Sequence, residues 1–228
     1  MNKISVTKAN ALIDARYKLN TNAQKLVLTC IAKLNPREIP PKEIKLSASE
    51  YSERMGIDIK NAHRELYKAA DALFKSSITI LEGDEEIEIS WVQEKAKKIK
   101  GSGEVRLVWS DKVRKYISEL QSRFTTYELK NIAKLQSAHA IRLYELLQRF
   151  NDTGERYISL DDFKSSLGIG DKYPEFKTLK RDVITPAVKQ ISTHSDIEVF
   201  FDTVKRGRVV SALHFTFEQK VQMNMPLD

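Results

Sequence analysis

The sequence has one cysteine, few glycines and prolines, and no low-complexity run. Cys30 stands alone in 228 residues, so an internal disulfide is excluded. It lies in the apolar helical pattern KLVLTCIAKL, with no histidine close by, which predicts a small buried hydrophobic side chain. The lack of paired thiols is typical of a reducing compartment, so we expect a cytoplasmic protein.

Long apolar runs are also missing. No stretch approaches the length of a membrane span, and the first residues, MNKISVTKANAL, lack the apolar core of a signal peptide. We therefore expect no membrane partner. With 41% hydrophobic and 30% charged residues, the chain has the composition of a globular protein of one large or two ordinary domains.

Motifs for catalysis are absent too. The four histidines are scattered, with no two at the spacing of metal ligands: they are His63, His139, His194 and His214. The sequence has neither a Walker loop nor a dinucleotide-binding glycine pattern, and acidic residues such as Asp161-Asp162 are explained as helix caps. We expect no enzyme, no metal and no cofactor. A rolling-circle nicking enzyme, the rival from another class, would need a paired-histidine metal motif that is not here.

What the chain does contain is a basic excess, with 38 Lys and Arg against 31 Asp and Glu. A formal net charge of +7 permits a polyanionic partner without proving one. The order of elements is clearest in residues 159–217, where a short helix, a glycine turn, a longer basic helix and two strand-like runs follow one another. This order is the outline of a winged helix, whose second helix enters a DNA major groove.

The outline occurs twice. Ser47–Ile57, SASEYSERMGI, aligns without gaps to Ser159–Ile169, SLDDFKSSLGI. In both blocks an amphipathic helix precedes this segment, and a longer helix and a hairpin follow it. We predict an α+β fold of two tandem winged-helix domains, the first over residues 1–121 and the second over residues 122–228.

Periodicity predicts the individual elements. Expected helices are Thr21–Leu34 with Thr21 as N-cap, Ser47–Gly56 with a capping box, Asn61–Phe74 with Phe74 inward, Lys112–Leu120, Tyr127–Leu135 and Ser137–Phe150. Expected strands are Ile78–Leu81, Glu86–Val92, Val105–Trp109, Glu198–Val204 and Val209–Phe217.

The helix after the second glycine turn carries the predicted DNA contacts. Its core side is Leu179, Val183, Ile184, Ala187 and Ile191, and Pro186 is expected to kink or split it. The candidate DNA-binding residues here are Lys172, Lys177, Thr178, Lys180 and Arg181. On an ideal helix Lys180 falls near the apolar face, and we expect its stem to carry the charge outward. The alternative is a solvated basic helix face, which the glycine turn and the basic hairpin on either side disfavour.

The second hairpin has a basic tip. Lys205, Arg206 and Arg208 flank Gly207 and cannot be buried, so they face solvent or DNA phosphates. A merely soluble hairpin tip is the alternative. In the first domain the weaker candidates are Arg64, Lys68, Lys97 and Lys98, the last two in a predicted basic loop, EKAKKIKGSG. The predicted DNA-binding elements are more cationic in the second domain than in the first. We therefore expect the second domain to do most of the sequence-specific DNA recognition.

Four stretches then carry a family resemblance. They are ANALIDARYKLNTNAQKLVLTCIAKL, FTTYELKNIAKLQSAHAIRLYELL, FKTLKRDVITPAVKQI and VKRGRVVSALHFTF. With them the chain resembles the plasmid replication initiators of the iteron-binding, tandem winged-helix Rep family, from about Val6 to Phe217.

The resemblance implies a protein that binds double-stranded DNA at direct repeats of a plasmid origin and promotes duplex opening. It implies base reading by the second domain, and backbone contacts and dimerisation by the first. It further implies a monomer–dimer equilibrium, repression of its own promoter by the dimer, and recruitment of the host helicase and host initiator. A dimeric transcriptional repressor without initiator activity remains the alternative, since both uses share one fold.

Overall fold

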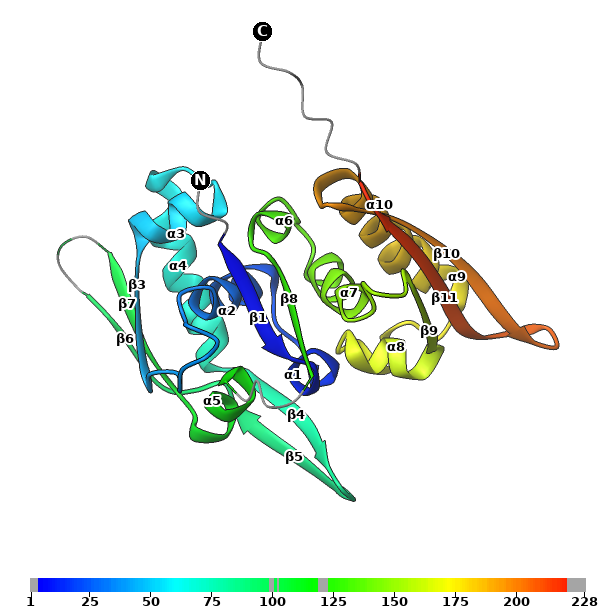
Figure 1. The fold of residues 1–228 in the computed structure, drawn as a ribbon, viewed down its shortest axis with the longest axis horizontal. Helices are drawn as coiled ribbons and strands as arrows, with labels where there is room; N and C mark the ends of the chain where they lie inside the picture. Colours follow the sequence, from blue (N-terminus) through cyan, green and yellow to red (C-terminus); the bar gives the residue numbers. More distant parts are fainter. Residues whose placement is uncertain (1–3, 99–100, 102, 119–122, 221–228) are drawn as a thin grey trace, which may run out of the picture.

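The computed structural model describes residues 4–98, 101, 103–118 and 123–220. It contains two winged-helix units side by side, with their hairpins at opposite ends of the molecule (Figure 1). Within the described residues, no helix is both long and apolar enough to span a bilayer. The expectation of a cytoplasmic location stays a prediction.

The two units repeat one order of elements. The first consists of α2 (Thr21–Ile31), β3 (Glu43–Ser47), α3 (Ala48–Met55), α4 (Ile59–Phe74), β6 (Val92–Lys97) and β7 (Glu104–Trp109). The second consists of α7 (Ala138–Gln148), β9 (Glu155–Ser159), α8 (Leu160–Ser166), α9 (Phe176–Leu179), α10 (Thr185–His194), β10 (Ile197–Arg206) and β11 (Val209–Gln219). The sheet orders, β3-β7-β6 and β9-β11-β10, correspond strand for strand. The predicted tandem winged-helix fold is therefore confirmed.

The matching segments have matching caps. Ser47 accepts a hydrogen bond from the Glu50 backbone N–H, and Ser159 accepts one from the Asp162 backbone N–H. Gly56 and Gly168 follow these helices with φ of 62° and 63°, a conformation that glycine adopts without steric cost. The gapless alignment of the two sequences thus reflects one local structure built twice.

Other elements surround this repeat. β4 (Ser77–Glu82) and β5 (Glu85–Ser90) form a hairpin that pairs with β2 (Arg16–Tyr17), and α5 (Asp111–Ser118) follows β7. The expected strand Glu86–Val92 is thus two strands that separate at the fully buried Trp91.

The region between the units differs from its sequence pattern. Tyr127–Leu135 was expected to be helical, but Tyr127 lies in β8 (Phe124–Glu128), which pairs antiparallel with β1 (Ser5–Ala9). Only α6 (Lys130–Ala133) is helical there. Pairing with a strand more than a hundred residues away overrides local propensity. The predicted boundary between residues 121 and 122 falls outside the described residues and stays a prediction.

Two smaller expectations were wrong. The N-cap of α2 is Asn20, whose side chain accepts from the Ala23 N–H, so Thr21 is already helical. Phe74 is 41% exposed at the end of α4, while Leu66, Ala70 and Leu73 are fully buried. Phe74 is the last residue of α4 and its ring lies at the surface, with the Lys95 Nζ 5.2 Å from the ring centre. Cys30, as expected, is buried, and burial raises the pKa of its thiol to about 12.

A buried charged cluster joins the two units. The Lys8 Nζ lies 2.7 Å from Glu145 Oε1, and the Arg142 Nη1 lies 3.1 Å from Glu145 Oε2. Tyr17 and Tyr127 donate further hydrogen bonds to the same carboxylate. Lys8 and Tyr17 belong to β1 and β2, whereas α7 supplies Glu145. The helix that begins the second unit is therefore anchored in the first.

Candidate nucleic-acid interface

The turn between α8 and α9 places the basic helix on the surface. After Gly168 the chain forms a short 3-10 turn, Gly170–Lys172, and α9 then begins at Phe176. Lys172 and Lys177 are exposed, and Thr178 is half-buried. The predicted DNA contacts before Lys180 therefore lie on one surface segment.

The basic helix is continuous but widens in the middle. Residues Lys180–Ile184 form a π-helical turn between α9 and α10. Pro186 is the second residue of α10, and it has no N–H to donate to the carbonyl of Asp182 four residues earlier. The helix accommodates proline by widening a turn and remains in one piece. The predicted core side is confirmed, since Leu179, Val183, Ile184, Ala187 and Ile191 are all buried.

Lys180 points away from the core. It is exposed, and its Nζ lies 5.5 Å from the ring centre of Phe201 on β10. The methylene stem thus follows the apolar surface while the ammonium reaches solvent, as the sequence predicted.

Arg181 has a neighbour that the sequence reasoning missed. Its Nε and Nη2 donate to the two carboxylate oxygens of Asp182 at 2.6 and 2.9 Å. These bonds raise the pKa of the guanidinium, which is 72% exposed. The face that would grip a guanine is therefore occupied in the free protein. An exposed ion pair of this kind is weak.

The hairpin of the second unit is longer than predicted. β10 and β11 pair from Ile197↔Gln219 to Arg206↔Val209, with one bulge after Val204. Gly207, at φ +61°, opens a two-residue turn, as type II′ hairpins require. The hairpin projects well beyond the body of the unit (Figure 1).

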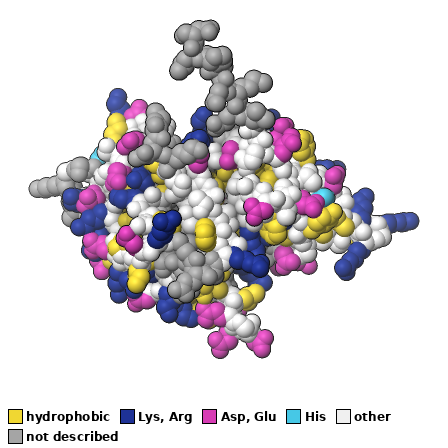
Figure 2. Space-filling model, in the orientation of Figure 1, with side chains coloured by type: hydrophobic (Ala, Val, Ile, Leu, Met, Phe, Trp, Pro, Cys, Tyr) yellow, Lys and Arg dark blue, Asp and Glu magenta, His cyan; other side chains and the backbone are white. Residues whose placement is uncertain are grey.

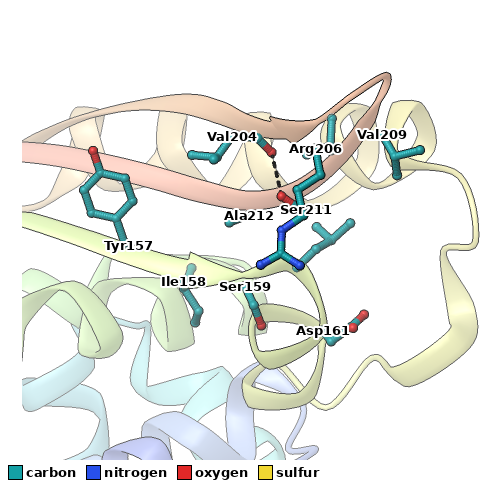
Figure 3. A pocket seen from close by; sticks show the side chains of 11 residues that line it. Tyr157, Ile158, Ser159, Asp161, Val204, Arg206, Val209, Ser211 and Ala212 are labelled. Carbon is teal, nitrogen blue, oxygen red and sulfur yellow. Dashed lines mark hydrogen bonds between the residues drawn. The ribbon is translucent and has the colours of Figure 1, made fainter.

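The cations of this tip are exposed and free of carboxylates. Lys205, Arg206 and Arg208 are all exposed, and none has an ion-pair partner in the described part of the chain. Dark-blue side chains stand out at this end of the molecule in Figure 2. Arg206 projects into an open groove of about 670 Å³ between the hairpin and the start of α8, toward Ser159 and Asp161 (Figure 3). These charges are available to a polyanion.

The described lysines of the first unit's hairpin are paired with carboxylates. The predicted basic loop is in fact mostly strand, since β6 runs to Lys97 and Lys95 lies within it. Asp71 of α4 pairs with Lys95 and, at 2.6 Å, with Lys97. The pKa of Asp71 is lowered by its hydrogen bonds from both lysines.

The other predicted DNA-binding residues of the first unit differ in their partners. Lys98 lies 3.3 Å from Glu104, and Arg64 donates to the side chain of Asn61. Lys68 is exposed and has no ion-pair partner among the described residues. Lys100, also in the predicted loop, lies outside the described residues. The charge asymmetry between the two units is thus larger in the structure than in the sequence.

Potential metal ligands are dispersed over the part of the chain that the structure describes. Among residues 4–98, 101, 103–118 and 123–220, no three His, Cys, Asp or Glu side chains gather where they could hold an ion. What the surface offers instead is an exposed basic helix and an unpaired basic hairpin on one unit.

These features define a tandem winged-helix protein. One family matches nearly the whole chain: its model described as "Initiator Replication protein, WH1" matches residues 5–148, and that described as "Initiator Rep protein, WH2" matches residues 159–217. The chain belongs to the family of initiator replication (Rep) proteins.

Individual relatives agree with this assignment. The chain is 32% identical over 238 residues to a replication initiation protein of Escherichia coli, across 99% of this chain and 73% of that protein. It is also 32% identical over 133 residues to the PI protein of Escherichia coli, across 50% of this chain and 44% of the relative.

Solved structures show the same fold. The Pi initiator protein, in complex with iteron DNA, superposes with a TM-score of 0.79 at 25% identity, across 96% of this chain and 99% of that one. Domains 2 and 3 of RctB superpose with a TM-score of 0.53 at 11% identity, across 89% and 83% of the two chains. The RctB match is a likeness of fold alone.

Proposed function

We propose that this protein is a replication initiator that binds directly repeated double-stranded sites, or iterons, at a plasmid origin. The observation that supports this most directly is the similarity, over 96% of the chain, to an initiator solved on iteron DNA. The exposed basic helix and the unpaired hairpin cations lie where a winged helix meets a duplex.

The proposal divides the work between the two units. The second unit reads bases through the helix that carries Lys177, Thr178, Lys180 and Arg181, with Lys172 before it. Lys205, Arg206 and Arg208 of the hairpin contact phosphates. The first unit contributes Arg64 and Lys68 to the DNA backbone, with Lys97 and Lys98 held by carboxylates in the free protein.

Origin function follows from binding in this proposal, without catalysis. On bound iterons the protein promotes duplex opening and recruits the host helicase and the host initiator. A dimer, joined through the first unit, represses its own promoter. These steps are the ones that membership of the initiator family suggests.

Binding to a direct-repeat duplex, measured by fluorescence anisotropy, tests the central claim. We expect binding about a thousandfold tighter, or more, than to a scrambled duplex of equal length, since about a thousandfold is the lower end of specificity ratios for such proteins. Equal affinity for both would contradict the proposal, and preference for an inverted repeat would indicate a dimeric repressor instead. Incubation of the protein with origin DNA and a divalent metal ion should leave both DNA strands intact. A nicked strand would show that the protein is an enzyme.

A further inference from the structure

A cavity of about 210 Å³ lies where the two units meet, away from the basic hairpin. It is lined by Lys18, Leu19, Asn20, Gln24, Ala138, His139, Leu167, Gly168, Ile169 and Lys172. Thr21 Oγ1 donates to the Gln136 carbonyl at 3.3 Å beside it, so the starts of α2 and α7 are joined here. The cavity exists only because both units are present.

Three basic side chains from separate segments converge on this cavity. Lys18 precedes α2, His139 lies in the first turn of α7, and Lys172 follows α8. No lining residue is acidic, and none of the three has a carboxylate partner in the part of the chain that the structure describes. Basic groups that lie close together without a counter-ion repel one another, so an anion in the cavity would be favourable.

The ionisation of His139 reports this convergence. Burial lowers the pKa of its imidazole, and the charges of Lys172 and Lys18 lower it further. The other charged or polar groups that face it across the cavity are those two ammonium groups and the side chains of Asn20 and Gln24. An anion in the cavity would reverse this effect and favour the imidazolium.

Two helices begin at the same place. α2 and α7 each have 11 residues, and the cavity is lined by Asn20, the N-cap of α2, and by Ala138 and His139, the first two residues of α7. The N-terminus of a helix carries a partial positive charge and backbone N–H groups without intrahelical acceptors. Both helices therefore favour an anion at this position.

Gln24 supplies an independent sign of a missing ligand. Its side chain is 4% exposed and lines the cavity, its Nε2 donates to the Leu19 carbonyl, and its Oε1 has no partner among the described residues. A buried acceptor without a donor is costly. A protonated phosphate oxygen, or a water bound to a phosphate, supplies that donor.

The walls of the cavity are held in close contact. A Cβ added to Gly168 would lie 2.6 Å from the Tyr17 carbonyl oxygen and 3.1 Å from Lys18 Cβ. The turn after α8 thus packs directly on the segment that carries Lys18.

We propose that this cavity binds a phosphate group, held by Lys18, Lys172, His139 and the two helix N-termini. The phosphate is either a free phosphate ion or a backbone phosphodiester of DNA that spans both units. The second source rests on the proposed function, whereas the first does not.

The test is the imidazole titration of His139, followed by NMR on the full chain with and without inorganic phosphate. His139→Gln assigns the resonance among the four histidines. We expect phosphate to move the midpoint upward by about one pH unit, which corresponds to tenfold coupling. Lys18→Gln and Lys172→Gln should each weaken phosphate binding about tenfold, while Lys75→Gln, exposed on the first unit, leaves it unchanged.

A second arm repeats the titration with a direct-repeat duplex in phosphate-free buffer. If the duplex shifts the His139 midpoint and phosphate ion does not, the site takes a phosphodiester and the proposal holds. If neither ligand shifts it, or Lys18→Gln and Lys172→Gln change nothing, the proposal is overturned. A chain that binds no duplex at all refutes the proposed function alone, because the phosphate arm still decides the cavity.

Discussion

Arg181 is the residue on which sequence reading depends most in the proposed function. It is exposed and lies on the face opposite the buried residues of the basic helix, yet it is held by two hydrogen bonds to Asp182. If Arg181 binds a guanine as proposed, the guanine has to displace the carboxylate of Asp182.

We predict that Arg181→Ala weakens binding to the direct repeat by about tenfold or more, with little change on a scrambled duplex, because alanine cannot form the two hydrogen bonds to guanine. Asp182→Ala should tighten repeat binding modestly, since the competing carboxylate is gone. Anisotropy titrations at one salt concentration measure both. Equal weakening on both duplexes for Arg181→Ala would exclude base reading by this residue.

At the scale of elements, the hairpin of the second unit differs from that of the first in having unpaired cations. We predict that Lys205→Gln, Arg206→Gln and Arg208→Gln together weaken binding to every duplex alike. The slope of log affinity against log salt should flatten by about 0.9 for each DNA phosphate that the hairpin no longer neutralises. Lys95→Gln, whose charge is already balanced by Asp71, is the control. An unchanged slope in the triple variant would remove the hairpin from the interface.

The two glycine turns form a matched pair of elements. Gly56 has nothing within 4 Å of an added Cβ, whereas at Gly168 the Tyr17 backbone stands in the way. Both have positive φ, so alanine costs about 1–2 kcal/mol at either site. We predict that Gly168→Ala lowers the free energy of unfolding clearly more than Gly56→Ala, by urea titration. Equal decreases would show that the close contact between units yields easily.

At the scale of the whole molecule, stability depends on the buried cluster around Glu145. Burial alone would raise the pKa of this carboxyl, but Lys8 and Arg142 outweigh it and hold the pKa at about 2. A carboxyl whose pKa is lower in the folded state than in the unfolded state stabilises the folded protein at pH values above its ordinary pKa. This contribution is lost as the pH falls toward 2.

We therefore predict that the free energy of unfolding declines from pH 5 toward pH 2, and that Glu145→Gln removes part of this decline. At neutral pH, Glu145→Gln should cost about 3–5 kcal/mol, because it leaves Lys8 and Arg142 buried without a counter-ion. Glu218→Gln, on the exposed face of β11, is the control for charge alone. Urea titrations at several pH values measure both effects, and parallel curves for wild type and Glu145→Gln would refute the role of this residue.

The sequence by itself determined the repeated unit and its caps. Ser47, Gly56, Ser159 and Gly168 act within a few residues of themselves, and hydrophobic periodicity selects the buried face of each helix. Such local features can be predicted from the sequence because capping hydrogen bonds and turn conformations need no distant partner.

Only the tertiary structure decided which charges are free and where the units meet. Lys97 and Lys205 look alike in sequence, but Asp71 reaches Lys97 from another element, whereas Lys205 has no ion-pair partner among the described residues. The strand that contains Tyr127 takes its conformation from β1 at the start of the chain. The cavity at His139 likewise combines segments more than a hundred residues apart. Coulombic attraction and strand pairing act through space, so sequence spacing carries no record of them.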